Sequence, residues 1–173
     1  MPGAGKSTAA KALVARGWKR VVMGDVVREE TKRRGLVPDA KNTGEVMKDL
    51  RKRKGEAAVA DLCMEQVKLL RSERIVVDGI RSMVEVARFR EGAEVLLVAV
   101  HASRNRRYAL LKERGRSDDP LTSEMFRARD DRELAIGIAV PIALADEVVL
   151  NEHATTDSLS KQIVAAVEGW SES

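Results

Sequence analysis

The sequence predicts an α/β protein in which a parallel sheet lies between two layers of helices. Short apolar segments alternate along the 173 residues with longer amphipathic ones, which is the pattern of strands joined by helices. A glycine-rich segment opens the chain directly before a helical pattern. Because crossovers between parallel strands are right-handed, this order gives a three-layer α/β/α sandwich with ligands at the carboxyl ends of the strands.

The elements follow from periodicity and from the residues that punctuate it. A first helix is expected over residues 6–16, ending at Gly17, which suits the turn that closes a helix. Asp25 is expected to cap the second helix, and Ser82 with Glu85 matches a capping box. Strands are expected at residues 18–23, 74–78, 94–100 and 146–150. Further helices are expected at residues 26–34, 38–54, 56–72, 82–92, 103–114, 122–145 with a break at Gly137 or Pro141, and 155–170.

Composition narrows the class of protein. The length suits one domain over residues 1–173, and no segment approaches the roughly 18 apolar residues of a membrane span or matches a signal peptide, so a cytoplasmic protein is expected. A single cysteine, Cys63, excludes an internal disulfide. The net charge of +4 is compatible with binding of nucleic acid. Aromatic residues make up only 3% of the chain, however, and do not form a surface on which bases could stack. A small polyphosphate ligand explains the same excess of arginine.

The first eight residues, MPGAGKST, match all but the opening glycine of the phosphate-binding pattern G-x-x-x-x-G-K-[ST]. Glycines allow positive φ and expose successive N–H groups to an anion at the start of a helix. Lys6 can reach the β- and γ-phosphates, and the Ser7 hydroxyl can hold Mg²⁺. The competing interpretation is a flexible glycine-rich terminus. The candidate nucleotide-binding residues of this segment are Pro2, Gly3, Ala4, Gly5, Lys6, Ser7 and Thr8.

A strand should lead into such a loop, and we expect about eight apolar residues ending in glycine to precede Met1. That strand would be central in the sheet, so a chain without it would leave buried N–H and C=O groups unpaired. A form lacking this strand is therefore a candidate for lost activity.

Several strings together resemble the P-loop nucleotide kinases related to adenylate kinase and dephospho-coenzyme A kinase. They are MPGAGKST, VVMGDVVREE, VVDGIRS, RGRSDDP and ALADEVVLNE, and they span nearly the whole chain. More narrowly, the chain is similar to an archaeal group of proteins related to adenylate kinase. The resemblance implies an acceptor-binding helical lobe at about residues 25–72 and a short lid at about residues 114–135.

The resemblance also assigns roles to residues after the second and third strands. Gly24, Asp25 and Arg28 match the segment that opens the acceptor lobe, while an N-cap and a solvated charge are the plainer interpretation. Asp78 matches the carboxylate that holds the Mg²⁺ shell through water. Arg81 stands one residue earlier than the family's acceptor-binding arginine, which leaves its contact in doubt.

The lid implied by RGRSDDP would supply arginines over the transferring phosphate. The candidate arginines are Arg107, which would bind the nucleotide, Arg114 and Arg116, which would act in catalysis, and Arg129 and Arg132, which would bind the acceptor. Asp118 and Asp119 would pair with some of them. The alternative is a charge-rich, solvated helix. Asn151 matches the residue that begins the loop near the adenine, or is an ordinary turn residue.

These residues predict a kinase that transfers the γ-phosphoryl group of Mg-ATP to a small nucleotide or nucleotide-like acceptor, of the nucleoside monophosphate or dephospho-coenzyme A type. Lys6, Asp25, Arg114 and Arg116 are the catalytic candidates. Asp25 would act as general base for a hydroxyl acceptor and would only position a phosphate acceptor. The alternative is an ATP-dependent regulatory protein with slow ATPase activity, whose basic segments 28–34, 48–54 and 104–116 bind RNA or a partner.

Overall fold

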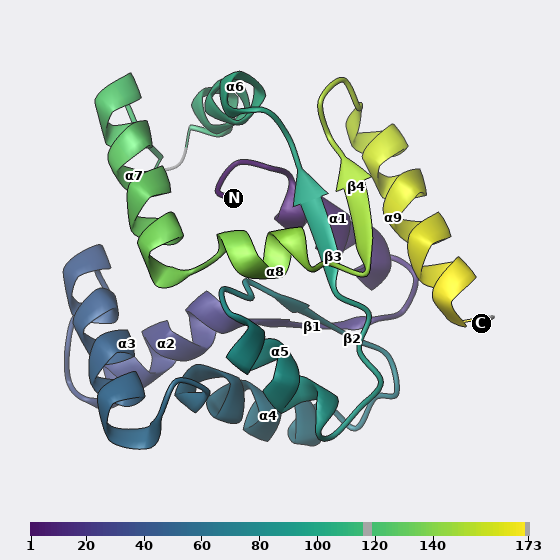
Figure 1. Cartoon of the computed structure of the whole chain (residues 1–173). Coiled ribbons are helices and arrows are strands. Elements are labelled where there is room, and N and C mark those ends of the chain that lie inside the picture. Colours follow the sequence, from purple (N-terminus) through teal and green to yellow (C-terminus); the bar gives the residue numbers. More distant parts are fainter. Residues whose placement is uncertain (116–118, 172–173) are drawn as a thin grey trace. The chain divides into compact units, whose positions relative to one another are not determined.

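The computed structural model describes residues 1–115 and 119–171, and its elements alternate as an α/β protein requires (Figure 1). In chain order they are α1 (Lys6–Val14), β1 (Lys19–Val22), α2 (Met23–Arg33), α3 (Ala40–Lys54), α4 (Ala58–Leu70), β2 (Ile75–Asp78), α5 (Met83–Arg90), β3 (Val98–His101), α6 (Arg104–Arg114), α7 (Ser123–Ile136), α8 (Ala139–Ala143), β4 (Glu147–Leu150) and α9 (Thr156–Ser171).

The chain forms two compact units. The first unit combines Met1–Arg16 with Leu96–Ser173, and the second is Gly17–Val95. The first eight residues, called here the phosphate-loop segment, and the expected lid at about residues 114–135 therefore belong to the first unit. The expected acceptor lobe, residues 25–72, belongs to the second unit.

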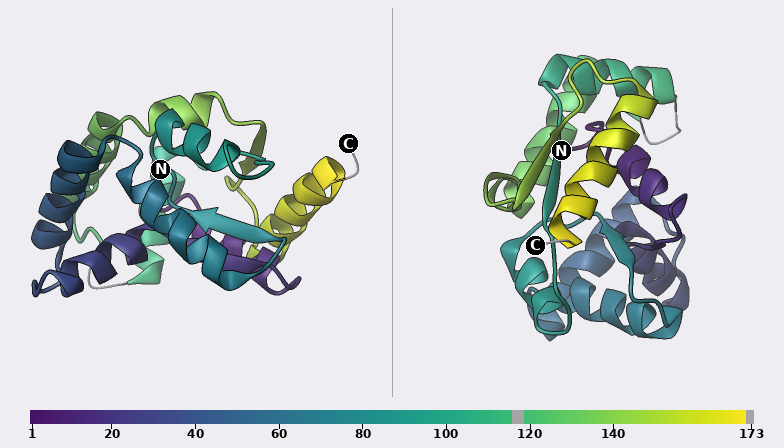
Figure 2. Two further views of the ribbon diagram at one scale, coloured as in Figure 1. Left: turned by 90° about the horizontal axis from the view of Figure 1, so that it is seen from below. Right: turned by 90° about the vertical axis from the view of Figure 1, so that its right-hand side faces the viewer.

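The first unit is built on the parallel pair of β3 and β4, in which Val98 lies opposite Glu147 and His101 opposite Leu150. Helix α1 packs against α9, and α9 packs against β4 (Figures 1 and 2). On β4 only Val149 is buried, because one face of the strand turns to these helices. The buried apolar side chains of the three elements include Leu13, Val149, Leu159, Ile163 and Val167.

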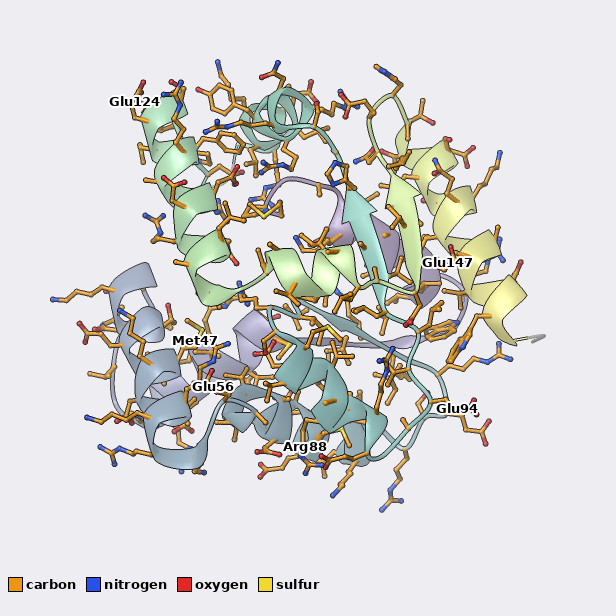
Figure 3. All side chains as sticks on the ribbon, viewed as in Figure 1. Met47, Glu56, Arg88, Glu94, Glu124 and Glu147 are labelled. Atoms are coloured by element: carbon orange, nitrogen blue, oxygen red, sulfur yellow. The ribbon has the colours of Figure 1, made fainter. Side chains whose placement is uncertain are left out.

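The second unit is built on the parallel pair of β1 and β2, in register from Lys19 opposite Ile75 to Val22 opposite Asp78. Helices α2, α3 and α4 contact one another, and α5, which carries Arg88, lies against α4 (Figure 3). Arg88 Nε donates to Asp61 Oδ1 on α4 at 2.6 Å. The core gathers Met23, Leu50, Cys63 and Phe89 among others. Burial raises the pKa of the Cys63 thiol to about 12, so this cysteine is an inert packing residue.

The predicted α/β class with parallel strands is confirmed, and so are the capping box of Ser82 with Glu85 and the helix break at Gly137. The strands are shorter than expected, since the apolar segment 94–100 becomes extended only from Val98. Within the described residues the strands pair as β1 with β2 and β3 with β4, in two sheets. No described helix is long and apolar enough to cross a membrane.

One predicted cap is wrong. Helix α2 begins at Met23 directly after β1, with Val22 as its N-cap and no capping side chain. Asp25 therefore lies inside the first turn and does not precede the helix. A carboxylate there still interacts favourably with the positive end of the helix dipole, which explains why the sequence pattern resembled a cap.

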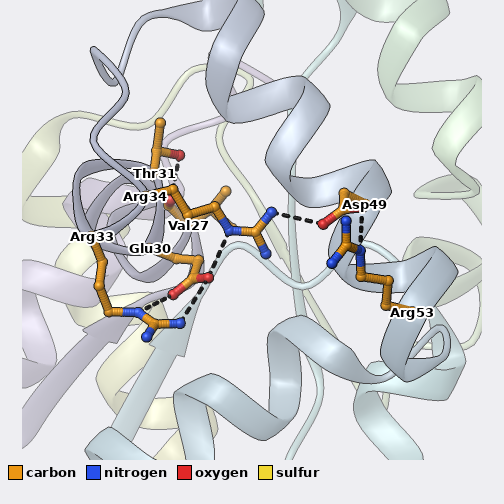
Figure 4. Close-up of polar contacts among 7 residues, drawn as sticks. All are labelled: Val27, Glu30, Thr31, Arg33, Arg34, Asp49 and Arg53. Carbon is orange, nitrogen blue, oxygen red and sulfur yellow. Dashed lines mark hydrogen bonds and ion pairs between the residues drawn. The ribbon is translucent and has the colours of Figure 1, made fainter.

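A chain of charges joins α2 to α3 in the second unit (Figure 4). The Glu30 carboxylate is 7% exposed and accepts from Arg33 Nε at 2.7 Å and from Arg34 Nε at 2.8 Å. Arg34 also donates to Asp49 on α3 at 2.7 Å, and Arg53 donates to the same carboxylate at 2.7 Å. Hydrogen bonds from Arg33, then from Arg34, hold the pKa of Glu30 at about 2. The ionised carboxylate is thus part of the packing of this lobe.

We predict that Glu30→Gln lowers the free energy of unfolding by about 1 to 3 kcal/mol at pH 7, because two guanidinium groups lose a buried anion. Since the folded-state pKa of Glu30 lies below its unfolded value of 4.5, the stabilisation is present above pH 4.5 and disappears as the pH falls toward 2. Urea denaturation of the wild type and of Glu30→Gln across this pH range measures the difference in the free energy of unfolding. The exposed neighbour provides the control, Glu29→Gln, and an equal loss in that variant would contradict the prediction.

Candidate functional site

The phosphate-loop segment of the first unit adopts the backbone that its glycines predict. Gly3 has φ +78° and Gly5 has φ +101°, both in the region that side chains disfavour. A Cβ on Gly3 would lie 2.7 Å from Arg107 O, and one on Gly5 would lie 2.6 Å from Asn151 Nδ2. Close approach of the loop to α6 and to the end of β4 therefore requires glycine at both positions.

The carbonyl groups of the loop are held from two sides. Arg107 Nη1 donates to Pro2 O at 3.0 Å, and Asn151 Nδ2 donates to Ala4 O at 3.0 Å. Asn151, which is 5% exposed, is itself fixed because its backbone N–H donates to His101 O at 2.7 Å. Its amide thus lies against the loop backbone, and the predicted contact with an adenine stays a prediction.

Arg107 is buried beneath the loop. Its guanidinium makes a two-pronged pair with Asp130 of α7, with Nη1 to Oδ1 at 2.8 Å and Nη2 to Oδ2 at 2.6 Å. The cation also lies 5.0 Å from the centroid of the Phe126 ring. Arg107 is 5% exposed and Asp130 is 6% exposed. Arg107, which was predicted to bind the nucleotide, therefore binds other groups of the protein.

The start of α6 is hydrogen-bonded to the loop after β4. Ser103 is the N-cap of α6, and both its backbone N–H, at 2.7 Å, and its hydroxyl, at 2.6 Å, donate to the Glu152 carboxylate. These two hydrogen bonds lower the pKa of Glu152. Asn151 and Arg107 are thereby anchored on segments that are joined to each other.

The helix end that follows the loop is suited to an anion. Gly5 is the N-cap of α1 and has no side chain that could cap the helix, so only its backbone oxygen serves the first turn, accepting from Thr8 N–H at 2.9 Å and from Ala9 N–H at 3.0 Å. Ser7 and Thr8 lie in the first turn, both half-buried. Lys6 Nζ donates to Met1 O at 2.8 Å, so the ammonium lies back over the loop. Backbone amides, ammonium and hydroxyl here fit a magnesium-bound triphosphate.

The predicted lid arginines meet a shared carboxylate. Asp119, whose side chain is 3% exposed, accepts from Arg114 Nε of α6 at 2.8 Å and lies 3.5 Å from Arg129 Nη1 of α7. Two of the predicted arginines are thus brought together, as the expected pairing with Asp119 requires. Arg132 is exposed on α7. Arg116 and Asp118 lie outside the described residues.

In the second unit, the predicted acceptor residues lie where the strands end. Asp25 and Arg28 form an ion pair on α2, and both side chains are about half exposed, at 56% and 50%. Arg81 donates its Nη1 to Gly79 O at 3.2 Å in the turn after β2. Asp78, the last residue of β2, is paired with Arg20 of β1. The metal role of Asp78 would require this ion pair to open or to share the carboxylate.

Sequence reasoning missed the partners of these residues, namely Asp130, Glu152 and Arg20. One signal was present for Asp130, which stands four residues after Phe126 and so shares its buried helix face. A carboxylate on a buried face needs a cationic partner. Within the described ranges, no group of three or more His, Cys, Asp or Glu side chains is arranged to hold a metal ion.

We predict that Gly5→Ala destabilises the protein more than Gly17→Ala does. Both glycines have positive φ, +101° and +90°, but a Cβ at Gly17 meets nothing within 4 Å. The control therefore isolates the backbone strain of about 1 kcal/mol, and Gly5→Ala adds the collision with Asn151, for a total of about 2 to 4 kcal/mol. Urea denaturation measures both, and equal losses would show that the close approach is unimportant.

Comparison with solved structures supports the fold. The shikimate kinase of Aquifex aeolicus matches with a TM-score of 0.50 over 97% of this chain and 92% of its own, at 19% sequence identity. This likeness shows the fold alone, and it confirms the α/β architecture with parallel strands that the sequence predicted.

Comparison with other sequences supports the family. A family model described as an AAA domain matches residues 1–126. A UPF0200 protein of Thermococcus onnurineus is 47% identical over 157 residues, covering 88% of this chain and 85% of its own, and one of Methanocaldococcus jannaschii is 44% identical over 163 residues, covering 93% and 83%. The resemblance to an archaeal group is confirmed. The chain therefore belongs to the UPF0200 family, and its residues 1–126 match the AAA domain model.

Proposed function

We propose that this protein is a kinase that transfers the γ-phosphoryl group of Mg-ATP to a small nucleotide or nucleotide-like acceptor. The observation that carries the proposal is the loop of residues 1–5, whose carbonyl groups are held by Arg107 and Asn151 at the start of an uncapped helix. Such a backbone leaves N–H groups for phosphate oxygens. The kinase type of the fold supports the same conclusion.

The first unit supplies the nucleotide-binding groups. Lys6 would leave Met1 O to bind the β- and γ-phosphates, and the Ser7 hydroxyl would hold Mg²⁺. Asp78, at the end of β2, is a further candidate that would hold the Mg²⁺ shell through water. When bound, Mg²⁺ neutralises charge on the phosphates. Arg114 and Arg129, which already share Asp119, stabilise the negative charge of the transferring phosphoryl group. Arg116 and Arg132 complete this set.

The second unit supplies the acceptor-binding groups. Arg28 and Arg81 attract an anionic acceptor, and Asp25 stands beside Arg28 at the start of α2. A phosphate acceptor is already a nucleophile, so Asp25 would only position it. A hydroxyl acceptor must lose a proton, and Asp25 would then be the general base.

The rival function, an ATP-dependent protein that binds RNA through its basic segments, is less well supported. Many cations of those segments are engaged with carboxylates inside the protein and do not form an open positive field. The pairs are Arg28 with Asp25, Arg34 with Glu30 and Asp49, Arg51 with Glu85, Arg53 with Asp49, Arg107 with Asp130, and Arg114 with Asp119. RNA affinity with a steep salt dependence would favour the rival.

We predict that Mg-ATP raises the melting temperature and that one phosphate- or hydroxyl-bearing acceptor stimulates ATP consumption. The panel is AMP, CMP, UMP, dephospho-coenzyme A and shikimate, the last chosen from the structural neighbour's name.

We predict that Lys6→Ala lowers turnover by about a hundredfold or more, because it removes a cation from the phosphates. Lys11→Ala, an exposed lysine of the same helix, is the control. A chain stabilised by no nucleoside triphosphate and stimulated by no acceptor would refute the kinase.

We predict that Asp25→Asn separates the two acceptor classes. With a hydroxyl acceptor, kcat falls by about 10² to 10⁴, the usual contribution of a general base. With a phosphate acceptor, kcat changes by less than about tenfold and KM rises, since only positioning is lost. Steady-state kinetics with the acceptor identified by the panel measures both. Glu29→Gln on the exposed surface of the same helix serves as control, and unchanged kcat and KM in Asp25→Asn would remove Asp25 from the site.

A further inference from the structure

Arg107 connects three parts of the first unit through one guanidinium group. It donates to Pro2 O in the loop, pairs on both prongs with Asp130 of α7 and lies over the ring of Phe126. Its own carbonyl group faces Gly3, whose missing Cβ would lie 2.7 Å away. Arg107 therefore contacts the loop at two consecutive residues without facing solvent.

The hydrogen bond to Pro2 O has a consequence for the next N–H group. The peptide unit is planar and trans, so the C=O of Pro2 and the N–H of Gly3 point in opposite directions. A donor that holds Pro2 O on the α6 side thereby turns the Gly3 N–H away from α6. Asn151 acts in the same way on the peptide unit between Ala4 and Gly5. It holds Ala4 O, so the Gly5 N–H points away from Asn151.

Asp130 gives the guanidinium its direction. A two-pronged contact with a carboxylate fixes the plane of the guanidinium, which a single hydrogen bond does not. Because the two side chains are only 6% and 8% exposed, an unpaired Arg107 would be strongly disfavoured there. Asp130 also comes from α7, next to Arg129 in the chain, so the helix that carries a predicted phosphate-binding arginine also directs the loop.

We propose that Arg107 and Asp130 are positioning residues that aim the Gly3 N–H at a phosphate group of the bound nucleotide. The inference rests on the proposed function, since it assumes that the loop binds a nucleoside triphosphate. Neither side chain touches the phosphate. Asp130 acts on Arg107, Arg107 acts on the Pro2 carbonyl, and the peptide plane passes the orientation to Gly3.

The test removes the ion pair without leaving a buried charge. In the double variant Arg107→Met/Asp130→Leu, apolar side chains of similar length replace the pair, a change that commonly preserves stability. The full chain is labelled with ¹⁵N-glycine and titrated with Mg-ATP. In the wild type we expect the amide proton signals of Gly3 and Gly5 to move downfield as they bind phosphate. In the double variant we expect the Gly5 shift to remain, the Gly3 shift to be lost, and the affinity for Mg-ATP to fall about tenfold.

Each outcome decides between distinct conclusions. If neither glycine responds to any nucleoside triphosphate in the wild type, the proposed function fails. If both respond in the wild type and the Gly3 shift persists in the double variant, the positioning role is overturned. Should the double variant unfold, Asp130→Asn is compared with Asp131→Asn, an exposed neighbour. A selective loss of the Gly3 shift in Asp130→Asn supports the role, and equal Gly3 shifts in the two variants overturn it.

Discussion

The phosphate-loop segment depends on two hydrogen bonds that fix its carbonyl groups. Arg107 and Asn151 hold Pro2 O and Ala4 O, and the planar peptide units convert these contacts into directions for the following N–H groups. The rest of the first unit keeps the two donors in place. Asp130 and Phe126 hold Arg107, and the β3 backbone holds Asn151. A short backbone segment thus gathers contacts from α6, α7 and the end of β4.

This chain has few aromatic side chains and many charged ones, and several of the charged side chains form buried ion pairs. Aromatic residues make up 3% of the chain and charged residues 34%. Arginine side chains pair with carboxylates at Glu30, Glu85, Asp119 and Asp130, each of which is buried. A two-pronged contact has a narrow geometry, so the pair of Arg107 on α6 with Asp130 on α7 restricts how these two helices meet.

The two units divide the expected chemistry between them. The first contains the loop, the start of α1 and the arginines that share Asp119, all of which suit a triphosphate. The second contains Asp25 with Arg28 at the start of α2, next to the end of β1. Here the ion pair is half exposed, in contrast to the buried pairs elsewhere, so its charges remain accessible to an acceptor. The identity of the acceptor is left to experiment.

The sequence by itself determined the α/β class, the order of strands and helices, the phosphate loop and the capping box of Ser82 with Glu85. Each of these depends on residues close together in the chain, where periodicity and backbone preferences act. Only the tertiary structure decided that Asp130 holds Arg107, that Arg20 pairs with Asp78 and that Asn151 binds Ala4 O. These contacts join residues 23, 58 and 147 positions apart. A local pattern cannot encode them, because packing chooses which of many arginines and carboxylates meet.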